Sequence, residues 1–230
     1  MNSEELKRLV AQAACDEVLK LPAGECLGIG TGSTANWFID LLAPHQSHFA
    51  GVVSSSIAST QRLIQHGFYV LDTNQVSNLP VYVDGADEIN PQGHMVKGGG
   101  GALTREKIIA AMAKRFICIC DASKQVAVLG QFPLPLEIIP LAEAYITRVL
   151  TALGGEVRLR MTGTASQPFI TDNGGWILDV HGLTITQPEQ LEVQINQIPG
   201  VVSVGLFAKR KADLLLVGGL TGVVAVAHNR

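Results

Sequence analysis

Short apolar runs alternate with segments of helical periodicity along the first half of the chain. Apolar residues at helical spacing after Ser3 predict an N-terminal helix that is capped by Ser3 and ends before Pro22. Further helices are predicted over residues 35–42, 57–66 and 102–114, and strands over residues 26–29, 52–54, 68–71, 81–83 and 116–120. Strands and helices that alternate in this way form a mostly parallel sheet with helices on both faces.

The pattern of alternating short strands and helices changes after Pro133, Leu134 and Pro135, which indicate a linker. The elements expected beyond it are a strand at 137–139, a helix at 142–153, strands at 157–161, 169–170 and 176–180, a helix at 189–198 and a strand at 201–207. This order is the β-α-β-β-α-β pattern of the split ferredoxin-like motif. A last strand at 213–217 has no place in that unit and is assigned to the first sheet. We therefore expect one domain from residues 1–132 and 208–230, and a smaller α+β domain from residues 133–207.

A glycine- and hydroxyl-rich loop, residues 30–34, connects the first strand to the next helix. Such a loop directs N–H groups and the positive end of a helix towards an anion, although a tight turn with a helix cap is the simpler structural interpretation. The last glycine of a dinucleotide fingerprint is missing, no acidic residue follows about 20 residues later, and there is no Walker lysine. The loop therefore predicts a site for a single phosphate.

The segment 82–107 contains most of the residues that could take part in catalysis. It holds Asp84 and Asp87, then Lys97, then four consecutive glycines at 98–101, and Glu106 in the following helix. Glycines in this number cost conformational entropy, so a ligand held against bare backbone is expected there. A carboxylate beside an ammonium group suits proton transfer next to a carbonyl, with Glu106 as the base and Lys97 on the enediolate oxygen. Each acid alone could equally be a surface residue, and Asp84, Asp87 and Glu88 would make only a sparse magnesium site.

Four polar residues stand at or just after the ends of predicted strands: Thr31, Ser54, Asp84 and Lys124. In parallel sheets, ligands bind beyond the carboxyl ends of the strands. We therefore expect these four side chains to lie along one edge of the sheet.

Composition narrows the class of protein. The chain has 230 residues, 47% of them hydrophobic and 16% charged, and a net charge of −3. The absence of a basic stretch argues against nucleic acid as a partner, and no apolar run reaches the roughly 18 residues of a membrane span. No signal-peptide core is visible. Cys15, Cys26, Cys118 and Cys120 lack zinc spacing, and we expect them to be buried, reduced thiols of a cytoplasmic protein.

Several motifs together closely resemble the type A ribose-5-phosphate isomerases. They are Gly-Thr-Gly-Ser-Thr at 30–34, Ser-Ser-Ser at 54–56, Asp-Gly-Ala-Asp-Glu at 84–88, Lys-Gly-Gly-Gly at 97–100, Leu-Thr-Arg-Glu-Lys at 103–107, Asp-Ala-Ser-Lys at 121–124, Ile-Pro-Gly-Val-Val at 198–202 and Val-Gly-Leu-Phe at 204–207. The resemblance covers essentially the whole chain. It implies an α/β fold with a Rossmann-like sheet and a smaller ferredoxin-like domain. It also implies interconversion of D-ribose 5-phosphate and D-ribulose 5-phosphate in the non-oxidative pentose phosphate pathway.

The resemblance also implies roles for individual residues. Glu106 takes the proton-acceptor position, and Asp84 and Lys97 complete the catalytic candidates. No metal or cofactor is expected, and the protein is expected to be a cytoplasmic homodimer or dimer of dimers. The substrate-binding candidates are Thr31, Gly32, Ser33, Thr34, Asp84, Gly85, Ala86, Asp87, Lys97, Gly98, Gly99, Gly100 and Lys124.

Two departures from the family pattern are visible. Gly101 stands where many relatives are expected to have alanine, and residues 162–168 look like a longer loop than is usual. Other classes stay open at this point. A sugar-phosphate-sensing domain could keep the phosphate loop without turnover, and a CoA-transferase or amino-sugar-phosphate deaminase of related fold would use the acids differently.

Overall fold

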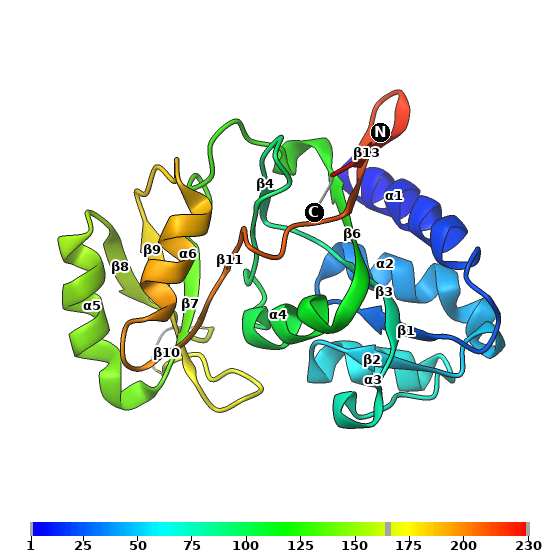
Figure 1. The fold of residues 1–230 in the computed structure, drawn as a ribbon, viewed down its shortest axis with the longest axis horizontal. Coiled ribbons are helices and arrows are strands. Elements are labelled where there is room, and N and C mark those ends of the chain that lie inside the picture. Colours follow the sequence, from blue (N-terminus) through cyan, green and yellow to red (C-terminus); the bar gives the residue numbers. More distant parts are fainter. Residues whose placement is uncertain (1, 164–166, 229–230) are drawn as a thin grey trace. The chain divides into compact units, whose positions relative to one another are not determined.

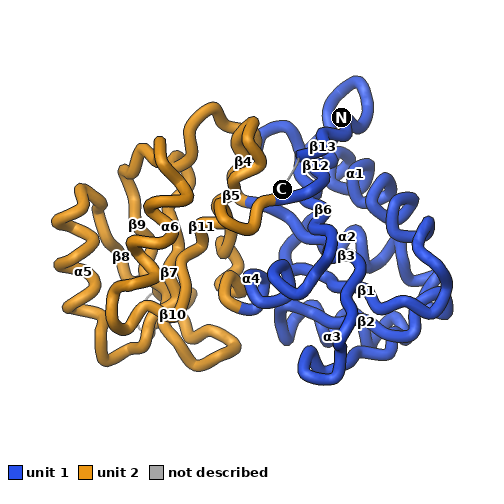
Figure 2. The backbone as a smooth tube through the Cα atoms, viewed as in Figure 1, with its two compact units in different colours: residues 1–86, 105–124, 212–230 blue, residues 87–104, 125–211 orange. Residues whose placement is uncertain are grey.

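The computed structural model describes residues 2–163 and 167–228, so residues 164–166 of the run at 162–168 lie outside the described part. The chain forms two compact units (Figure 2). The first comprises residues 1–86, 105–124 and 212–230, and the second comprises residues 87–104 and 125–211. Each is described by itself.

The first unit is built on a six-stranded sheet of order β13-β12-β6-β3-β1-β2 (Figure 1). Five of the strands are parallel and β13 runs antiparallel to β12. The helices are α1 (Ser3–Val18), α2 (Ser33–Leu42), α3 (Ile57–Gln65) and α4 (Leu103–Met112), and the strands are β1 (Cys26–Ile29), β2 (Gly51–Ser54), β3 (Leu79–Asp84), β6 (Ala113–Asp121), β12 (Leu214–Gly219) and β13 (Gly222–Ala227). The expected parallel sheet is therefore confirmed, and the strand predicted at 213–217 joins it as β12.

Helices cover both faces of this sheet. Val10 of α1, Phe38 of α2 and Leu63 of α3 belong to one core cluster with Leu27 and Val83, which point to the same face of the strands. On the other face, a Cβ added to Gly28 would lie 3.0 Å from Ile109 of α4 and 3.0 Å from Tyr82. Successive strand residues point to opposite faces, so each strand contributes to both layers.

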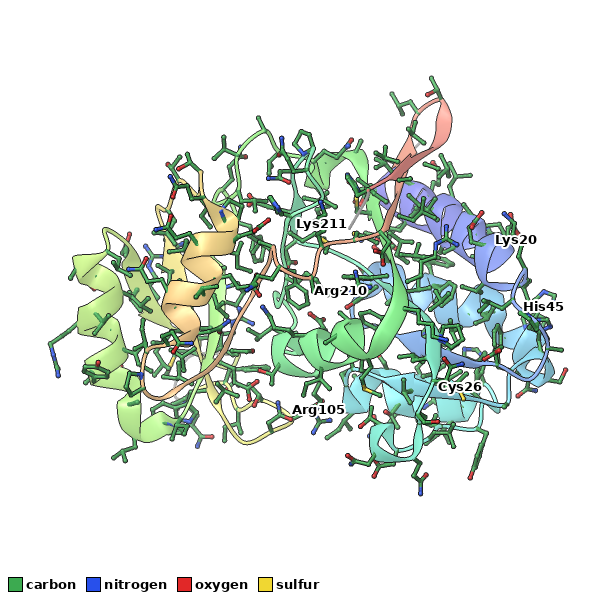
Figure 3. The ribbon with its side chains drawn as sticks, viewed as in Figure 1. Lys20, Cys26, His45, Arg105, Arg210 and Lys211 are labelled. Atoms are coloured by element: carbon green, nitrogen blue, oxygen red, sulfur yellow. The ribbon has the colours of Figure 1, made fainter. Side chains whose placement is uncertain are left out.

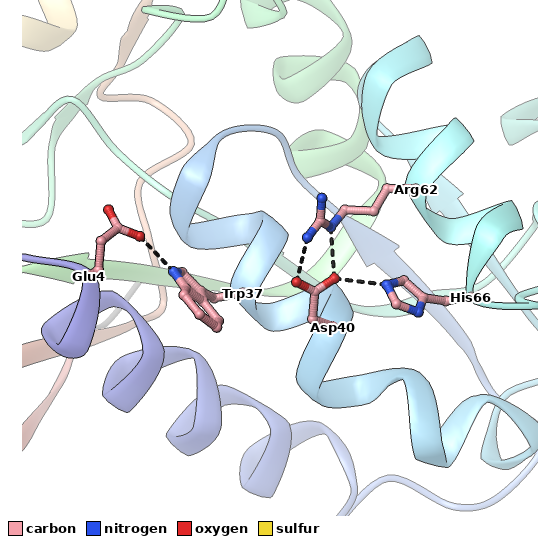
Figure 4. Close-up of polar contacts among 5 residues, drawn as sticks. All are labelled: Glu4, Trp37, Asp40, Arg62 and His66. Carbon is pink, nitrogen blue, oxygen red and sulfur yellow. Dashed lines mark hydrogen bonds and ion pairs between the residues drawn. The ribbon is translucent and has the colours of Figure 1, made fainter.

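Polar contacts tie the helices of the first layer together (Figure 4). Trp37 Nε1 donates to Glu4 of α1 at 2.9 Å. Asp40 of α2 accepts from Arg62 of α3 and lies 2.8 Å from Nε2 of His66, the residue that follows α3 in the chain as its C-cap. These pairs link α1 to α2 and α2 to the end of α3.

Two local expectations in this unit are wrong. The cap of α1 is Asn2, one residue earlier than Ser3, and it forms a capping box with Glu5. The segment at 68–71 is not a full strand, because it pairs with β2 only at Val70, opposite Val52. Phe68 and Val70 still pack on the core cluster of this unit, whereas Tyr69 between them is largely exposed.

The second unit contains an antiparallel sheet of order β10-β7-β9-β8. Numbered along the motif, this order is 4-1-3-2, the ferredoxin-like arrangement that the sequence predicted. The elements are β7 (Leu134–Ile138), α5 (Glu143–Ala152), β8 (Glu156–Leu159), β9 (Trp176–His181), α6 (Pro188–Asn196) and β10 (Val201–Val204). Leu134 and Pro135 belong to β7 and not to a linker, because Leu134, Leu136 and Ile138 carry buried side chains into this core.

A three-stranded sheet of order β11-β5-β4 completes the second unit. Its strands are β4 (Glu88–Ile89), β5 (Met95–Val96) and β11 (Leu206–Phe207). The buried carboxylate of Glu88 accepts from the N–H groups of Gly130 at 2.7 Å and Phe132 at 2.6 Å. These contacts bring residues 87–104 and 125–132 into the second unit, whereas the sequence placed the boundaries at 132 and 207.

Among the residues that the structure describes, no helix is long and apolar enough to cross a membrane. All four cysteines are free thiols, three of them buried, and Cys26 is half-buried. Burial raises the pKa of the Cys15 thiol to about 12. The expected burial is therefore found for three of the four thiols, and Cys26 is the exception.

Candidate active site

The loops after β1 and β3 leave the sheet at the point where the strand order reverses. The chain passes from β1 to β2 on one side, and β3 and β6 follow on the other side of β1. Thr31, Ser54, Asp84 and Lys124 therefore stand at the carboxyl ends of four neighbouring parallel strands, as the sequence predicted. Such a reversal opens a crevice between loops, and it is where α/β sheets bind ligands.

The loop at residues 30–34 is held in place by Asp84. A Cβ at Gly30 would lie 1.9 Å from Oδ1 of Asp84, so only glycine fits there. The N–H of Thr31 donates to that same oxygen at 3.0 Å. Gly32 has a φ of +113°, a left-handed conformation that favours glycine, and it is the N-cap of α2.

Hydroxyl groups complete the loop. Thr31 Oγ1 lies 2.7 Å from Ser55 Oγ, and Ser59 Oγ donates to the carbonyl oxygen of Gly30 at 2.8 Å. Gly32, the N-cap of α2, has no side chain to cap the helix. The first N–H groups of a helix have no partner within the helix, so this end suits an anion.

Asp84 is completely buried, and its carboxylate accepts hydrogen bonds from three donors. Its Oδ1 accepts from the N–H groups of Thr31 and of Gly85, the latter at 2.7 Å, and its Oδ2 accepts from Tyr82 at 2.5 Å. Burial, with the nearby charges of Asp84 and Glu106, raises the pKa of Tyr82 well above its usual range. Tyr82 therefore remains a hydrogen-bond donor at any working pH.

Sequence reasoning assigned no role to Tyr82, Ser55 or Ser59, although Ser55 stands in the Ser-Ser-Ser motif. A signal for Tyr82 was present, since it precedes Asp84 by two residues in β3, and residues two apart in a strand share a face. The serines could not be assigned in this way because their contacts join segments far apart in the sequence.

Glu106 lies in the first turn of α4 and is only 3% exposed. The positive end of a helix favours a carboxylate there. Its neighbours Arg105 (labelled in Figure 3) and Lys107 are less buried than Glu106 itself. Lys124 is half-buried at the end of a short 3-10 turn after β6, where Asp121 accepts from the N–H of Ser123 at 2.9 Å.

The remaining candidates belong to the second unit. Lys97 is 2% exposed, its N–H donates to Gly205 at 2.8 Å, and its Nζ lies 5.6 Å from the centre of the Phe207 ring. Asp87 Oδ2 accepts from the N–H of Gly99 at 2.7 Å. This carboxylate therefore braces the glycine loop that follows Lys97.

Gly98 and Gly101 adopt left-handed backbone conformations, with φ values of +106° and +79°. A Cβ at Gly98 would lie 2.8 Å from Leu103, and a Cβ at Gly101 would lie 2.4 Å from the Phe169 ring. Gly101, where many relatives are expected to have alanine, therefore occupies a place where alanine would be strained.

The sequence candidates thus divide into two sets. Thr31, Gly32, Ser33, Thr34, Asp84, Gly85, Ala86, Glu106 and Lys124 belong to the first unit, and Asp87, Lys97, Gly98, Gly99 and Gly100 belong to the second. Within residues 2–163 and 167–228, no group of three His, Cys, Asp or Glu side chains is arranged to hold a metal ion.

Known proteins identify the family. A model described as ribose 5-phosphate isomerase A (phosphoriboisomerase A) matches residues 51–222. A ribose-5-phosphate isomerase A of Polynucleobacter asymbioticus is 66% identical over 231 aligned residues, which cover 97% of this chain and 98% of the relative. The chain belongs to the ribose 5-phosphate isomerase A family. The resemblance drawn from the motifs is confirmed.

Solved structures of this family share the whole fold. Ribose 5 phosphate isomerase A from Neisseria gonorrhoeae is 42% identical, with a TM-score of 0.93, and the match covers 100% of this chain and 99% of that one. A D-ribose-5-phosphate isomerase solved in complex with phospho-erythronic acid is 36% identical, with a TM-score of 0.92 and coverage of 99% and 100%. The Rossmann-like sheet with a smaller ferredoxin-like unit is therefore the fold of the family.

Proposed function

We infer that this protein is a ribose-5-phosphate isomerase, an enzyme of the pentose phosphate pathway that interconverts D-ribose 5-phosphate and D-ribulose 5-phosphate. The observation that carries this inference is 66% identity to a ribose-5-phosphate isomerase A over 97% of the chain. Identity at that level over the full length argues against the sensor, the CoA-transferase and the deaminase.

Glu106 is the proposed base. Its carboxylate takes the proton from C2 of the aldose and returns it to C1, while the proton of the C2 hydroxyl moves to the C1 oxygen. The reaction balances because the proton taken from C2 is returned to C1, and the proton of the C2 hydroxyl ends on the C1 oxygen. Burial of Glu106 at 3% exposure supports this role, since a base shielded from water keeps the abstracted proton from exchanging before it returns.

Lys97 and the backbone of Gly98, Gly99 and Gly100 are proposed to stabilise the enediolate oxygen. The ammonium group of Lys97 is almost fully buried, and a charge in a site without bulk water acts more strongly than it does in solution. Glycines leave the backbone of this loop open to a close approach by the ligand, with the N–H of Gly99 already donating to Asp87.

The phosphate is proposed to bind the N–H and hydroxyl groups of Thr31, Gly32, Ser33 and Thr34, with Lys124 as a counter-charge. The N-terminus of α2, where the N-cap Gly32 offers no capping side chain, supports this. Asp84 is proposed to fix that loop, while Gly85 and Ala86 offer backbone to the substrate and Asp87 fixes the glycine loop. No metal or cofactor enters the scheme.

The test is turnover of ribose 5-phosphate before and after dialysis against EDTA, together with Glu106→Gln. The variant keeps the shape of the side chain but cannot accept the proton, so kcat should fall by about 10² to 10⁴ with the fold intact. Glu189→Gln is the matched control, because Glu189 also lies in the first turn of a helix and is 66% exposed. Ligand binding without turnover would indicate a sensor, and activity restored only by a divalent ion would refute the metal-free scheme.

The protein is further proposed to be a cytoplasmic homodimer or dimer of dimers. The family resemblance supports this, and so does the edge strand β13, where Val224 is 56% exposed and Val226 is 37% exposed. An apolar sheet edge left open to water favours association. Sedimentation equilibrium measures the assembly, and a monomer at all concentrations would contradict the proposal.

A further inference from the structure

Arg160, the residue directly after β8, makes contacts that its neighbours do not. Its Nε and Nη2 bind the two carboxylate oxygens of Asp179 at 2.8 and 2.5 Å. Its Nη1 donates to the carbonyl oxygen of Gly98 at 3.1 Å and to that of Gly99 at 3.0 Å. The guanidinium also lies 5.8 Å from the centre of the Phe169 ring. All of these residues belong to the second unit, and the Arg160 side chain is 16% exposed.

These contacts immobilise one peptide group at both ends. The carbonyl of Gly98 and the N–H of Gly99 belong to the same planar unit. Arg160 binds the carbonyl, and Asp87 Oδ2 accepts from the N–H at 2.7 Å. The plane of this peptide is therefore fixed, although glycine by itself allows many orientations.

The next peptide group is fixed through its carbonyl. Arg160 binds the Gly99 oxygen, and in a trans peptide the N–H points opposite to the C=O. The N–H of Gly100 must therefore point away from the guanidinium, and Gly100 is exposed. A positive charge on the carbonyl side also polarises the amide, which strengthens the N–H as a donor.

The attachment of Arg160 is itself rigid. A guanidinium that binds a carboxylate through two parallel hydrogen bonds has a defined orientation. Asp179 is the carboxylate that binds Arg160 in this way. The remaining nitrogen, Nη1, therefore points at the glycine loop, and the guanidinium has little freedom to rotate. Arg158, two residues earlier, also binds a carboxylate through its Nε and Nη2, but it is 61% exposed, and both donors bind one oxygen of the exposed Glu156.

We propose that Arg160 is a positioning residue for the isomerase reaction, which orients the peptide groups of Gly98 and Gly99 so that the N–H of Gly100 donates to the enediolate oxygen. This inference rests on the proposed function. Arg160 does not touch the reacting atoms and acts through the backbone of the loop. Its contribution should appear in the transition state more than in substrate binding, because the oxygen gains its charge only there.

The kinetic test compares Arg160→Gln, Arg160→Lys and the control Arg158→Gln with ribose 5-phosphate. Arg160→Gln should lower kcat by about 10- to 100-fold with KM changed less than about threefold, the cost of a slightly misplaced donor. Arg160→Lys keeps the positive charge but loses the planar fork that binds Asp179 and the loop carbonyls together, so it should recover only part of kcat. Arg158→Gln should stay within about twofold of the wild type. An Arg160→Gln enzyme with kcat within about twofold of the wild type, or one changed only in KM, would overturn the proposal.

Hydrogen exchange of residues 97–103 tests the geometry without any turnover. Exchange should be faster in Arg160→Gln than in the wild type, and unchanged in Arg158→Gln. Equal exchange in all three proteins would show that Arg160 does not fix the loop and would overturn the inference even if the wild type is active. A wild type with no isomerase activity would instead refute the proposed function and the catalytic part of this inference with it. Should Arg160→Gln fail to fold, Asp179→Asn replaces it and is expected to give the same kinetic pattern more weakly.

Discussion

Replacing Tyr82 by Phe removes one oxygen and the hydrogen bond that it donates to Asp84. The acceptor is a completely buried carboxylate, and the bond measures 2.5 Å. Asp84 is shielded from bulk water, and the two N–H donors of Thr31 and Gly85 remain. A hydrogen bond to a charged group contributes about 1.5 to 3 kcal/mol, so Tyr82→Phe should lower the free energy of unfolding by about 2 kcal/mol.

The corresponding change in melting temperature follows from the size of the chain. With an unfolding entropy of about 2.1 cal/mol/K per residue, a loss of about 2 kcal/mol in a chain of this length lowers Tm by about 4 °C. The assay is thermal unfolding followed by circular dichroism at neutral pH. Tyr69→Phe is the matched control, because Tyr69 is 69% exposed, and its Tm should stay within about 1 °C of the wild type.

The comparison of the two tyrosine variants can refute the reasoning. If Tyr82→Phe melts within about 1 °C of Tyr69→Phe, the Tyr82 hydroxyl does not stabilise the buried carboxylate. A large loss of stability in both variants would show that the aromatic packing, and not the hydrogen bond, had been disturbed.

Three further predictions follow from the same structure. Lys97→Met should bind ribose 5-phosphate nearly as well as the wild type but turn it over about 10² to 10³ times more slowly, and a normal kcat with a raised KM would contradict this. Lys124→Ala should weaken calorimetric binding of inorganic phosphate and ribose 5-phosphate but not of ribose, and equal losses for ribose would mean that Lys124 contacts the sugar. Burial acts to raise the pKa of Asp40, but hydrogen bonds from Arg62 and His66 outweigh it and hold the pKa below its ordinary 3.8. A lowered folded pKa gives stability that is present above that ordinary value and lost as pH falls below it. The Tm difference between the wild type and Asp40→Asn should therefore shrink between about pH 5 and pH 3, and a constant difference would refute the ion pair.

The fold could be predicted because periodicity and chain order determine most of it. Alternating short strands and helices require a parallel sheet, and the β-α-β-β-α-β order allows few arrangements other than the observed β10-β7-β9-β8. The edge strand β13 was not foreseen. Val223 to Ala227 is apolar throughout and is mostly exposed, so no alternation of polar and apolar residues marks it as an edge strand.

The unit boundaries could not be predicted because long-range hydrogen bonds set them. Glu88 reaches the N–H groups of Gly130 and Phe132, more than forty residues away, and β5 pairs with β11 near the far end of the chain. Neither contact leaves a local signature. Sequence proximity therefore assigned residues 87–104 to the first domain, although their backbone partners lie in the second unit.

Asp84 and Asp87 show most clearly what could not be predicted from the sequence alone. They are the same residue type, three positions apart, and the sequence predicted both as substrate ligands. In the structure each braces a different loop. Asp84 accepts from the N–H of Thr31 and fixes the proposed phosphate loop, and Asp87 accepts from the N–H of Gly99 and fixes the glycine loop. A charged carboxylate accepts these hydrogen bonds more strongly than a neutral amide does. Replacing either aspartate by Asn should therefore preserve the shape of the side chain but loosen only the loop that this side chain holds. Asp84→Asn should therefore weaken phosphate binding and Asp87→Asn should not, a difference that no property of the two residues in the sequence reveals.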